Sequence, residues 1–141
     1  MPALVTNDAT EHCLRECLKS EGYNLSPRKA YGQTGVDILA SRGEEQIHIE
    51  VVGFKESPPA CSKDFYEVFF RAMSRIGSGA RRCAIALPRR FEQGLPARAG
   101  QYGQSWVRIG QAFPELEIWL VDTDAKSYRR TRWREWISSY Q

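Results

Sequence analysis

Two apolar segments of strand length constrain the fold of this chain most strongly. The segments 82–88, RCAIALP, and 115–122, ELEIWLVD, are nearly continuous runs of hydrophobic residues. Runs of this length are typical of strands that are buried on both faces, as in the parallel part of an α/β sheet. Helices must then cover both faces of the sheet, so the chain is predicted to fold as a three-layer α/β domain.

The length and composition favour one folded domain without a membrane-spanning segment. A chain of 141 residues has the size of an ordinary domain, and its 42% hydrophobic residues are typical of a globular protein. The sequence has no internal repeat and no apolar run near the ~20 residues of a membrane span. The N-terminal segment lacks a signal-peptide pattern. We therefore expect a single domain over residues 1–141, outside the membrane and in the cytoplasm.

Periodicity and turn residues place further elements around the two apolar strands. Residues 35–41 and 46–54 alternate with the two-residue period of strands, and Gly43 lies in the turn between them, so a β-hairpin is predicted. The other expected elements are a helix from Thr6 or Asp8 to Gly22, a short strand within 23–30, a loop over 55–63, a helix from Asp64 to Gly77 or Gly79, a helix from near Pro96, and an edge strand or short helix within 127–136. This order predicts a mixed sheet that starts antiparallel and becomes parallel.

Two carboxylates are expected on one face of the hairpin. Glu50 lies at the centre of the second strand, and Asp37 lies on the first. If the strands pair, their period of two places Asp37 and Glu50 close together on the same face. A buried carboxylate without a partner costs several kcal/mol, so the pair needs a metal ion, a basic partner or solvent. A metal site and ordinary ion pairs, with Lys55 or His48 for example, both stay open at this point.

Charge is distributed unevenly along the chain. Residues 1–70 contain 7 Lys and Arg against 11 Asp and Glu, whereas residues 71–141 contain 13 against 6. Nearly all the basic residues of the second half are Arg, whose planar guanidinium suits bidentate contacts with phosphate. This uneven charge is expected for an acidic site beside a phosphate-binding surface. It is equally expected for a basic surface that contacts only solvent. The arginines that we expect to contact nucleic acid are Arg71, Arg75, Arg89, Arg90, Arg130 and Arg132.

Three short motifs resemble those of a known superfamily. They are the string Glu11-x-x-Leu14-x-x-x-Leu18-x-x-x-Gly22-Tyr23, the strand GVDILA at 35–40 and the strand IHIEVVGFK at 47–55. Followed by a helix and an apolar strand, these motifs resemble the restriction-endonuclease-like PD-(D/E)xK nucleases. The resemblance covers the part of the chain that ends with the first apolar strand.

This resemblance implies a fold, an activity and a set of site residues. The family core is α-β-β-β-α-β, here with a C-terminal extension of helix and strand. The implied activity is that of a DNA endonuclease, which hydrolyses phosphodiester bonds with Mg²⁺ or Mn²⁺. By position, Asp37 and Glu50 match the metal-binding acids, and Glu11 matches the helical Glu that supports the site. Mg²⁺ binds through one or two carboxylates together with water and phosphate oxygens.

One position departs from the family pattern. The family lysine, which polarises the scissile phosphate or orients the attacking water, falls two residues after the strand acid, where this chain has Val52. Lys55 is the first candidate for that role, which makes the expected catalytic set Glu11, Asp37, Glu50 and Lys55. Lys63 is the second candidate.

Other functions stay open beside the endonuclease. One alternative is a catalytically inactive member of the same fold that binds nucleic acid or serves as a subunit of a larger assembly. Another is a domain that binds proteins through its Arg-rich half. A second copy of the chain or a partner subunit is a further expected partner, because a domain this small has no separate recognition module.

The cysteines favour packing roles. The four cysteines lack the paired C-x-x-C spacing of zinc ribbons and thioredoxin-type sites. His12, Cys13 and Cys17 lie close together on the first expected helix and are the nearest approach to a metal-binding cluster. Helical cysteines in a reducing compartment more often pack as small hydrophobic residues, and this is what we expect here.

Overall fold

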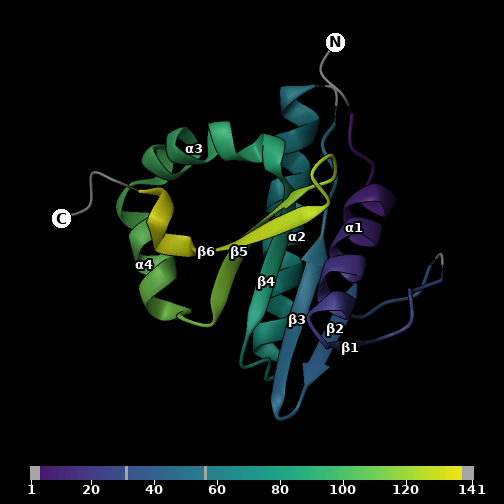
Figure 1. Cartoon of the computed structure of the whole chain (residues 1–141). Helices are drawn as coiled ribbons and strands as arrows, with labels where there is room; N and C mark the ends of the chain where they lie inside the picture. The colour runs from purple at the N-terminus through teal and green to yellow at the C-terminus, as the bar shows by residue number, and fades with distance from the viewer. Residues whose placement is uncertain (1–3, 31, 56, 138–141) are drawn as a thin grey trace.

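The computed structural model of the chain describes residues 4–30, 32–55 and 57–137. This part of the chain contains both helices and strands, and two short 3₁₀ turns follow the fourth and sixth strands (Figure 1). The elements are α1 (Asn7–Ser20), β1 (Asn24–Leu25), β2 (Ile38–Arg42), β3 (Glu45–Val51), α2 (Pro58–Gly77), β4 (Cys83–Pro88), a 3₁₀ turn (Arg89–Gly94), α3 (Leu95–Tyr102), α4 (Gln104–Ala112), β5 (Leu116–Asp122), β6 (Ser127–Arg132) and a second 3₁₀ turn (Trp133–Trp136).

The strands form one mixed, open sheet of six strands in the order β1-β2-β3-β4-β5-β6. β3, β4 and β5 are parallel to one another, whereas β1, β2 and β6 pair with their neighbours in antiparallel fashion. The two apolar segments of the sequence are β4 and β5, which pair from Cys83 opposite Leu116 to Pro88 opposite Val121. The predictions of an α/β fold and of a sheet that starts antiparallel and becomes parallel are therefore confirmed.

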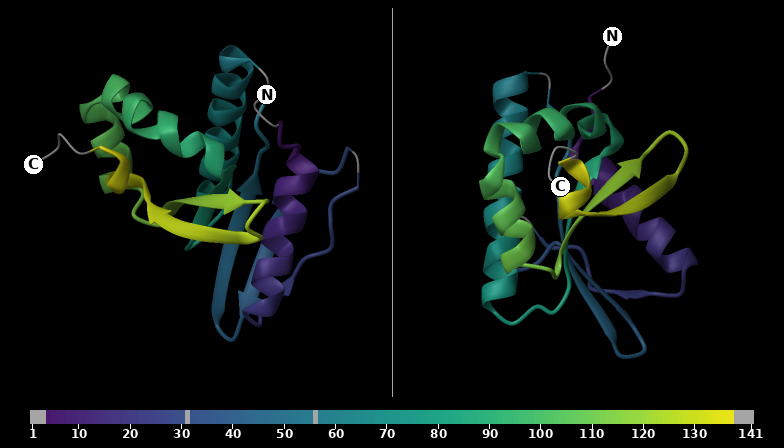
Figure 2. Two further views of the ribbon diagram at one scale, coloured as in Figure 1. Left: turned by 45° about the horizontal axis from the view of Figure 1, so that its top comes forward. Right: turned by 90° about the vertical axis from the view of Figure 1, so that its left-hand side faces the viewer.

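Helices cover both faces of the sheet, as the apolar strands require. On one face, Leu14 and Leu18 of α1 pack with Ile47 and Ile49 of β3 and with Trp119 of β5. On the other face, side chains of α2, α3 and α4 enclose a second core. The right-hand view of Figure 2 shows α1 on one side of the sheet and the other three helices on the opposite side. The hairpin β2–β3 therefore has α1 on one face and the end of α2 on the other.

The start of α2 differs from the sequence-based expectation. The loop predicted over 55–63 ends at Ser57, whose side chain accepts a hydrogen bond from the N–H of Ala60 at 3.3 Å and caps the helix. Pro58 and Pro59 then occupy the first helical positions, where the N–H that proline lacks would have no helical partner.

No helix in the described part of the chain is both long and apolar enough to cross a membrane.

The C-terminal elements and β1 also differ in their bounds from the elements expected from the sequence. The helix expected from near Pro96 is divided at Gly103, whose φ is 53°, into α3 and α4. The tail over 127–136 forms both predicted alternatives, the edge strand β6 followed by a 3₁₀ turn. The short strand expected within 23–30 contains two residues.

The residues before α1 pack tightly against the end of β3. Val5 and Phe54 form an antiparallel bridge, and the N–H of Gly53 donates to Oδ1 of Asn7 at 2.6 Å. A Cβ on Gly53 would lie 2.1 Å from the carbonyl oxygen of Val5, so this approach of two backbones needs a glycine. The contact fixes the start of α1 beside the segment that follows Glu50.

Candidate functional site

Asp37 and Glu50 lie opposite each other on the β2–β3 hairpin. Ile38 pairs with Ile49 in antiparallel register, so the next position along the hairpin places Asp37 opposite Glu50. Oδ2 of Asp37 accepts a hydrogen bond from the N–H of Val51 at 2.9 Å, which holds this carboxylate against β3. The hairpin thus brings the two carboxylates together.

Glu50 is fully buried, with 0% of its surface exposed. Its two carboxylate oxygens lie 3.4 Å from Nε of Arg71 and 3.5 Å from Nε of Arg75, both on α2. Neither oxygen has a hydrogen-bond partner among the described residues. Burial, and after it the charge of Asp37, raises the pKa of Glu50 from its usual 4.5 to about 7, against the opposing effect of the neighbouring basic side chains. Glu50 therefore gains or loses its proton near neutral pH.

A lysine that the sequence motifs did not single out contacts the site. Lys29 lies in the connection between β1 and β2, and its Nζ is 3.0 Å from Oδ1 of Asp37. Lys29 also donates a hydrogen bond to the carbonyl of Gly35 at 2.9 Å, which keeps Nζ beside Asp37. No spacing rule relates Lys29 to Glu50, because the path of the loop determines where the lysine lies.

Glu11 is connected to the site through Arg15. The Glu11 carboxylate lies 2.7 Å from Nε of Arg15 and 3.6 Å from Nε of Arg28. Arg15, which is 7% exposed, also donates hydrogen bonds to the carbonyls of Ser26 and Asp37. Glu11 thus helps to hold the segment that carries Asp37.

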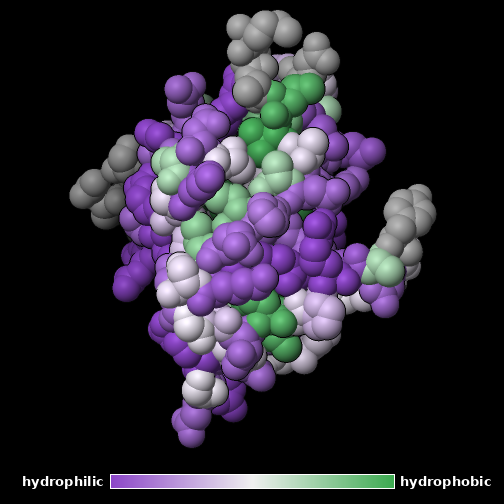
Figure 3. Space-filling model, turned by 45° about the vertical axis from the view of Figure 1, so that its right-hand side comes forward, coloured by the Kyte–Doolittle hydropathy of each residue, from purple (hydrophilic) through white to green (hydrophobic). Residues whose placement is uncertain are grey.

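Around α1 and the β1–β2 connection the molecular surface is mainly hydrophilic, with small separate apolar areas (Figure 3).

The two lysines expected to replace the family lysine have other contacts. Nζ of Lys55 lies 3.8 Å from Oδ2 of Asp64, near the start of α2. Nζ of Lys63 lies 3.8 Å from Oε1 of Glu67, and the Lys63 side chain is 76% exposed. Val52, at the family position, is 2% exposed and packs in the core between the sheet and α2. In the described structure, the lysine that contacts the carboxylate pair comes instead from the β1–β2 connection.

The arginines expected to bind nucleic acid are divided between the two faces of the sheet. Arg71 and Arg75 border the carboxylate pair on the face that α2 covers, whereas Arg130 lies 4.5 Å above the ring of Trp119 on the face that α1 covers. Arg89 forms an ion pair with Asp122 at 3.0 Å. Cζ of Arg90 lies 4.6 Å from the centre of the Phe54 ring. The backbone N–H of Arg132 donates a hydrogen bond to the carboxylate of Glu135 at 2.5 Å. Of these six arginines, Arg71 and Arg75 are therefore the two that lie beside Glu50 in the described part of the chain.

The carboxylate pair has the donors that a hard divalent cation needs. Mg²⁺ takes oxygen ligands, keeps several waters and is commonly held by one or two carboxylates. Both oxygens of Glu50 are buried and lack hydrogen-bond partners among the described residues, and Asp37 lies beside them. No three His, Cys, Asp or Glu side chains in the described ranges are grouped to hold a metal ion. The pair therefore fits Mg²⁺ or Mn²⁺ when water or phosphate completes the ligand set.

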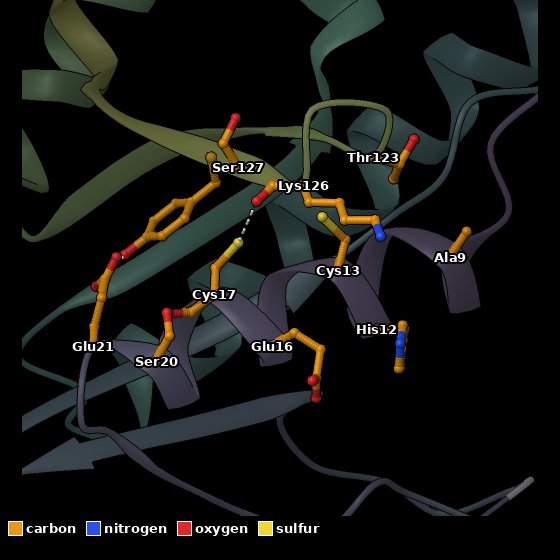
Figure 4. Close-up of a pocket in the computed structure, with 11 residues that line it drawn as sticks. Ala9, His12, Cys13, Glu16, Cys17, Ser20, Glu21, Thr123, Lys126 and Ser127 are labelled. Atoms are coloured by element: carbon orange, nitrogen blue, oxygen red, sulfur yellow. Dashed lines mark hydrogen bonds between the residues drawn. The ribbon is translucent and has the colours of Figure 1, made fainter.

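A hollow of about 720 Å³ lies between α1 and the β5–β6 turn (Figure 4). The Cys13 thiol donates to the carbonyl of Asp122 at 3.6 Å, and the Cys17 thiol donates to that of Lys126 at 3.5 Å. Burial, and after it the neighbouring Cys17, raises the pKa of Cys13 to about 11, so this thiol stays protonated at neutral pH. Figure 4 shows the His12 ring pointing away from both thiols. The cysteines thus join α1 to the turn through packing and weak hydrogen bonds.

A scan against models of known protein families finds no match for this chain, and a search of curated proteins finds no related sequence.

Proposed function

We propose that the protein hydrolyses phosphodiester bonds in DNA with Mg²⁺ or Mn²⁺ held by Asp37 and Glu50. The observation that carries the proposal is the buried Glu50 carboxylate, which lies opposite Asp37 and lacks a hydrogen-bond partner among the described residues. Buried acids with perturbed pKa values and charged neighbours are enriched at functional sites. The element order α1-β1-β2-β3-α2-β4 also agrees with the core of the PD-(D/E)xK nucleases that the motifs resemble, which is support by analogy.

Each side chain of the site has its own role in this proposal. Asp37 and Glu50 would hold the metal ion, which when bound lowers the pKa of a coordinated water and offsets negative charge on the phosphate. Lys29 adds a fixed positive charge next to Asp37 and takes the role of the family lysine. Arg71 and Arg75 lie beside Glu50, where guanidinium N–H groups hold phosphate oxygens and stabilise the charge that develops on them.

A second candidate function is phosphate binding without hydrolysis. It is favoured by the ion pairs of Arg71 and Arg75 with Glu50, at 3.4 and 3.5 Å, which neutralise the buried carboxylate within the protein itself. Val52 at the family lysine position favours it as well. In this case the protein serves as a nucleic-acid-binding or assembly subunit, and the basic side chains around Glu50 bind the phosphate.

Calorimetric titration of the full chain with Mg²⁺ and Mn²⁺, combined with plasmid nicking on the same samples, tests the proposal. Wild type is compared with the double variant Asp37→Asn, Glu50→Gln. Glu16→Gln is the matched control, because the Glu16 side chain is a 60% exposed carboxylate on α1. Hydrolysis predicts saturable metal binding and metal-dependent nicking in wild type and in the control, and the loss of both in the double variant.

The other outcomes separate the two candidates. DNA binding without metal binding or nicking in wild type would refute hydrolysis and support phosphate binding. Nicking that survives in the double variant would remove Asp37 and Glu50 from the mechanism.

A further inference from the structure

α2 and α3 present two facing rows of side chains, which we call the α2–α3 surface. Ser62, Tyr66 and Phe70 follow one another at one-turn spacing along α2, and Arg98 and Tyr102 do so along α3. Nη2 of Arg98 donates to Oγ of Ser62 at 3.4 Å. The hydroxyl of Tyr102 donates to that of Tyr66 at 2.8 Å. The two rows therefore form one continuous surface, on the side of the sheet away from α1 (Figure 2).

One end of the α2–α3 surface is an aromatic hollow. Phe70, Tyr66 and Tyr102 are 69%, 41% and 37% exposed, and they are three of the four exposed large hydrophobic side chains in the described part of the chain. They border a hollow of about 180 Å³ whose lining includes the buried rings of Trp106 and Trp133. Apolar side chains that gather at one exposed place mark a binding surface.

The other end is a basic pocket of about 470 Å³ at the start of α2, lined in part by Lys55, Arg90 and Arg98. Cζ of Arg90 lies 4.6 Å from the centre of the Phe54 ring, and Cζ of Arg98 lies 4.8 Å from that of the Phe65 ring. Stacking on a ring holds a guanidinium in one orientation, with its N–H groups directed along its edge. Arg98 connects the two ends of the surface, because it lines the basic pocket and also donates a hydrogen bond to Ser62 in the α2 row.

The charges on this surface favour an anionic ligand. Lys55 lies 3.8 Å from the carboxylate of Asp64. Lys63 lies 3.8 Å from that of Glu67. Arg98, in the described part of the chain, contacts a hydroxyl and two aromatic rings instead of a carboxylate. The surface therefore has an excess of positive charge, and a second copy of the chain placed face to face would bring like charges together.

We propose that the α2–α3 surface binds a single-stranded nucleic acid, with one base in the aromatic hollow and a neighbouring phosphate in the basic pocket. Stacking covers the faces of bases in a duplex, whereas an unpaired base offers its face to an exposed aromatic ring. A polyanion that carries flat rings matches both the charge and the aromatic side chains. The inference rests on the proposed function in taking the ligand to be nucleic acid, but it does not require hydrolysis at Glu50.

Fluorescence anisotropy of the full chain tests this inference, with a labelled oligothymidylate of about 20 nucleotides and a duplex of the same length as probes. Wild type should bind the single strand more tightly than the duplex and should lose affinity as salt is raised. Phe70→Leu keeps an exposed apolar side chain but removes the ring, so it should weaken binding by about 5- to 100-fold. Phe70→Trp keeps a ring and should retain the affinity.

A second pair of variants tests the basic pocket. Arg98→Gln should weaken binding of the single strand and reduce its salt dependence. Lys19→Ala is the matched control, because it removes one 61% exposed positive charge from α1 on the opposite face, and it should bind as wild type does.

Three results would overturn the inference. They are equal affinity of wild type and Phe70→Leu, equal affinity for single strand and duplex, and concentration-dependent dimerisation that Phe70→Leu abolishes. Failure of the proposed function is distinguishable from these results. Single-strand binding in a protein that never nicks DNA would refute hydrolysis alone, whereas metal-dependent nicking without single-strand binding would refute this inference alone.

Discussion

Nζ of Lys29 lies 3.0 Å from Oδ1 of Asp37, so a lysine from the β1–β2 connection contacts the carboxylate pair. The family pattern places its lysine on the same strand as Glu50, at the position of Val52, whose side chain here is in the core. A lysine that approaches from another segment brings the same positive charge to the same acids. The contact thus places a positive charge beside the two proposed metal-binding acids from a different part of the chain.

Replacing Lys29 by Met should lower the nicking rate by about 10²- to 10³-fold, the usual contribution of one group that stabilises developing charge. Lys19→Met is the matched control, since the Lys19 side chain is 61% exposed on α1, and it should keep the wild-type rate. Rates at saturating Mg²⁺ on folded variants measure the difference. A rate lost with Lys55→Met and kept with Lys29→Met would make Lys55 the active lysine.

Glu50 should make the stability of the protein depend on pH. Its pKa is about 7 in the folded protein against the usual 4.5, so between these values the unfolded chain loses the proton first. The free energy of unfolding therefore falls as pH rises from 4.5 to 7, and the effect levels off above 7. Relative to Glu50→Gln, which does not titrate, wild type should lose on the order of 3 kcal/mol. Urea unfolding at several pH values measures this, and a difference independent of pH would contradict the raised pKa.

Metal affinity should also depend on the Glu50 proton. A cation and a proton compete for the same carboxylate, so the affinity for Mg²⁺ should rise by up to about tenfold per pH unit below 7. Above that value the carboxylate is already ionised, and the affinity should level off. Calorimetry in buffers of different ionisation enthalpy counts the protons released. Binding that releases no proton below pH 7 would place the metal ion away from Glu50.

Arg15 should contribute strongly to stability, because it is buried and bonds Glu11 and two backbone carbonyls. Arg15→Met leaves the Glu11 carboxylate without this partner and should lower the free energy of unfolding by about 3–5 kcal/mol. Arg28→Met is the control: the Arg28 side chain is 51% exposed, so its ion pairs should contribute no more than about 1 kcal/mol. Equal losses in the two variants, measured by urea unfolding, would argue against a structural role for the buried pair.

Gly53→Ala should destabilise the junction between β3 and the segment before α1. The added Cβ would lie 2.1 Å from the carbonyl oxygen of Val5 and 2.7 Å from the backbone N of Asn7, so one backbone must move, at a cost of at least about 2 kcal/mol. Gly77→Ala, where no atom lies within 4 Å of the new Cβ, should leave stability unchanged or slightly increased. Thermal unfolding of the two variants tests this, and a Gly53→Ala protein as stable as wild type would contradict the close approach.

The hairpin and its carboxylate pair could be predicted because both depend on local patterns. Alternation over 35–41 and 46–54, with Gly43 in the turn at φ 60°, specifies which side chains share a face. Asp37 and Glu50 lie together for this reason. The α/β class could be predicted in the same way, because the continuous apolar runs of β4 and β5 need helices on both faces.

The start of α2 and the division between α3 and α4 depend on local contacts and backbone angles that hydrophobic periodicity does not indicate. The loop predicted over 55–63 contains Pro58 and Pro59, and proline usually interrupts a helix. Ser57 instead caps the helix and makes these prolines its first residues. The helix from Pro96 was expected to be continuous, and the positive φ of Gly103 divides it.

The basic partners of the two acids come from two separate parts of the chain, the β1–β2 connection and α2. Local periodicity and composition specify the type and order of most elements and the face that Asp37 and Glu50 share. They do not specify that Lys29 approaches from a loop, or that Arg71 and Arg75 lie over the sheet from α2. Hydrophobic periodicity is a property of neighbouring residues, whereas the packing of a loop or helix on a sheet depends on contacts between residues far apart in the sequence.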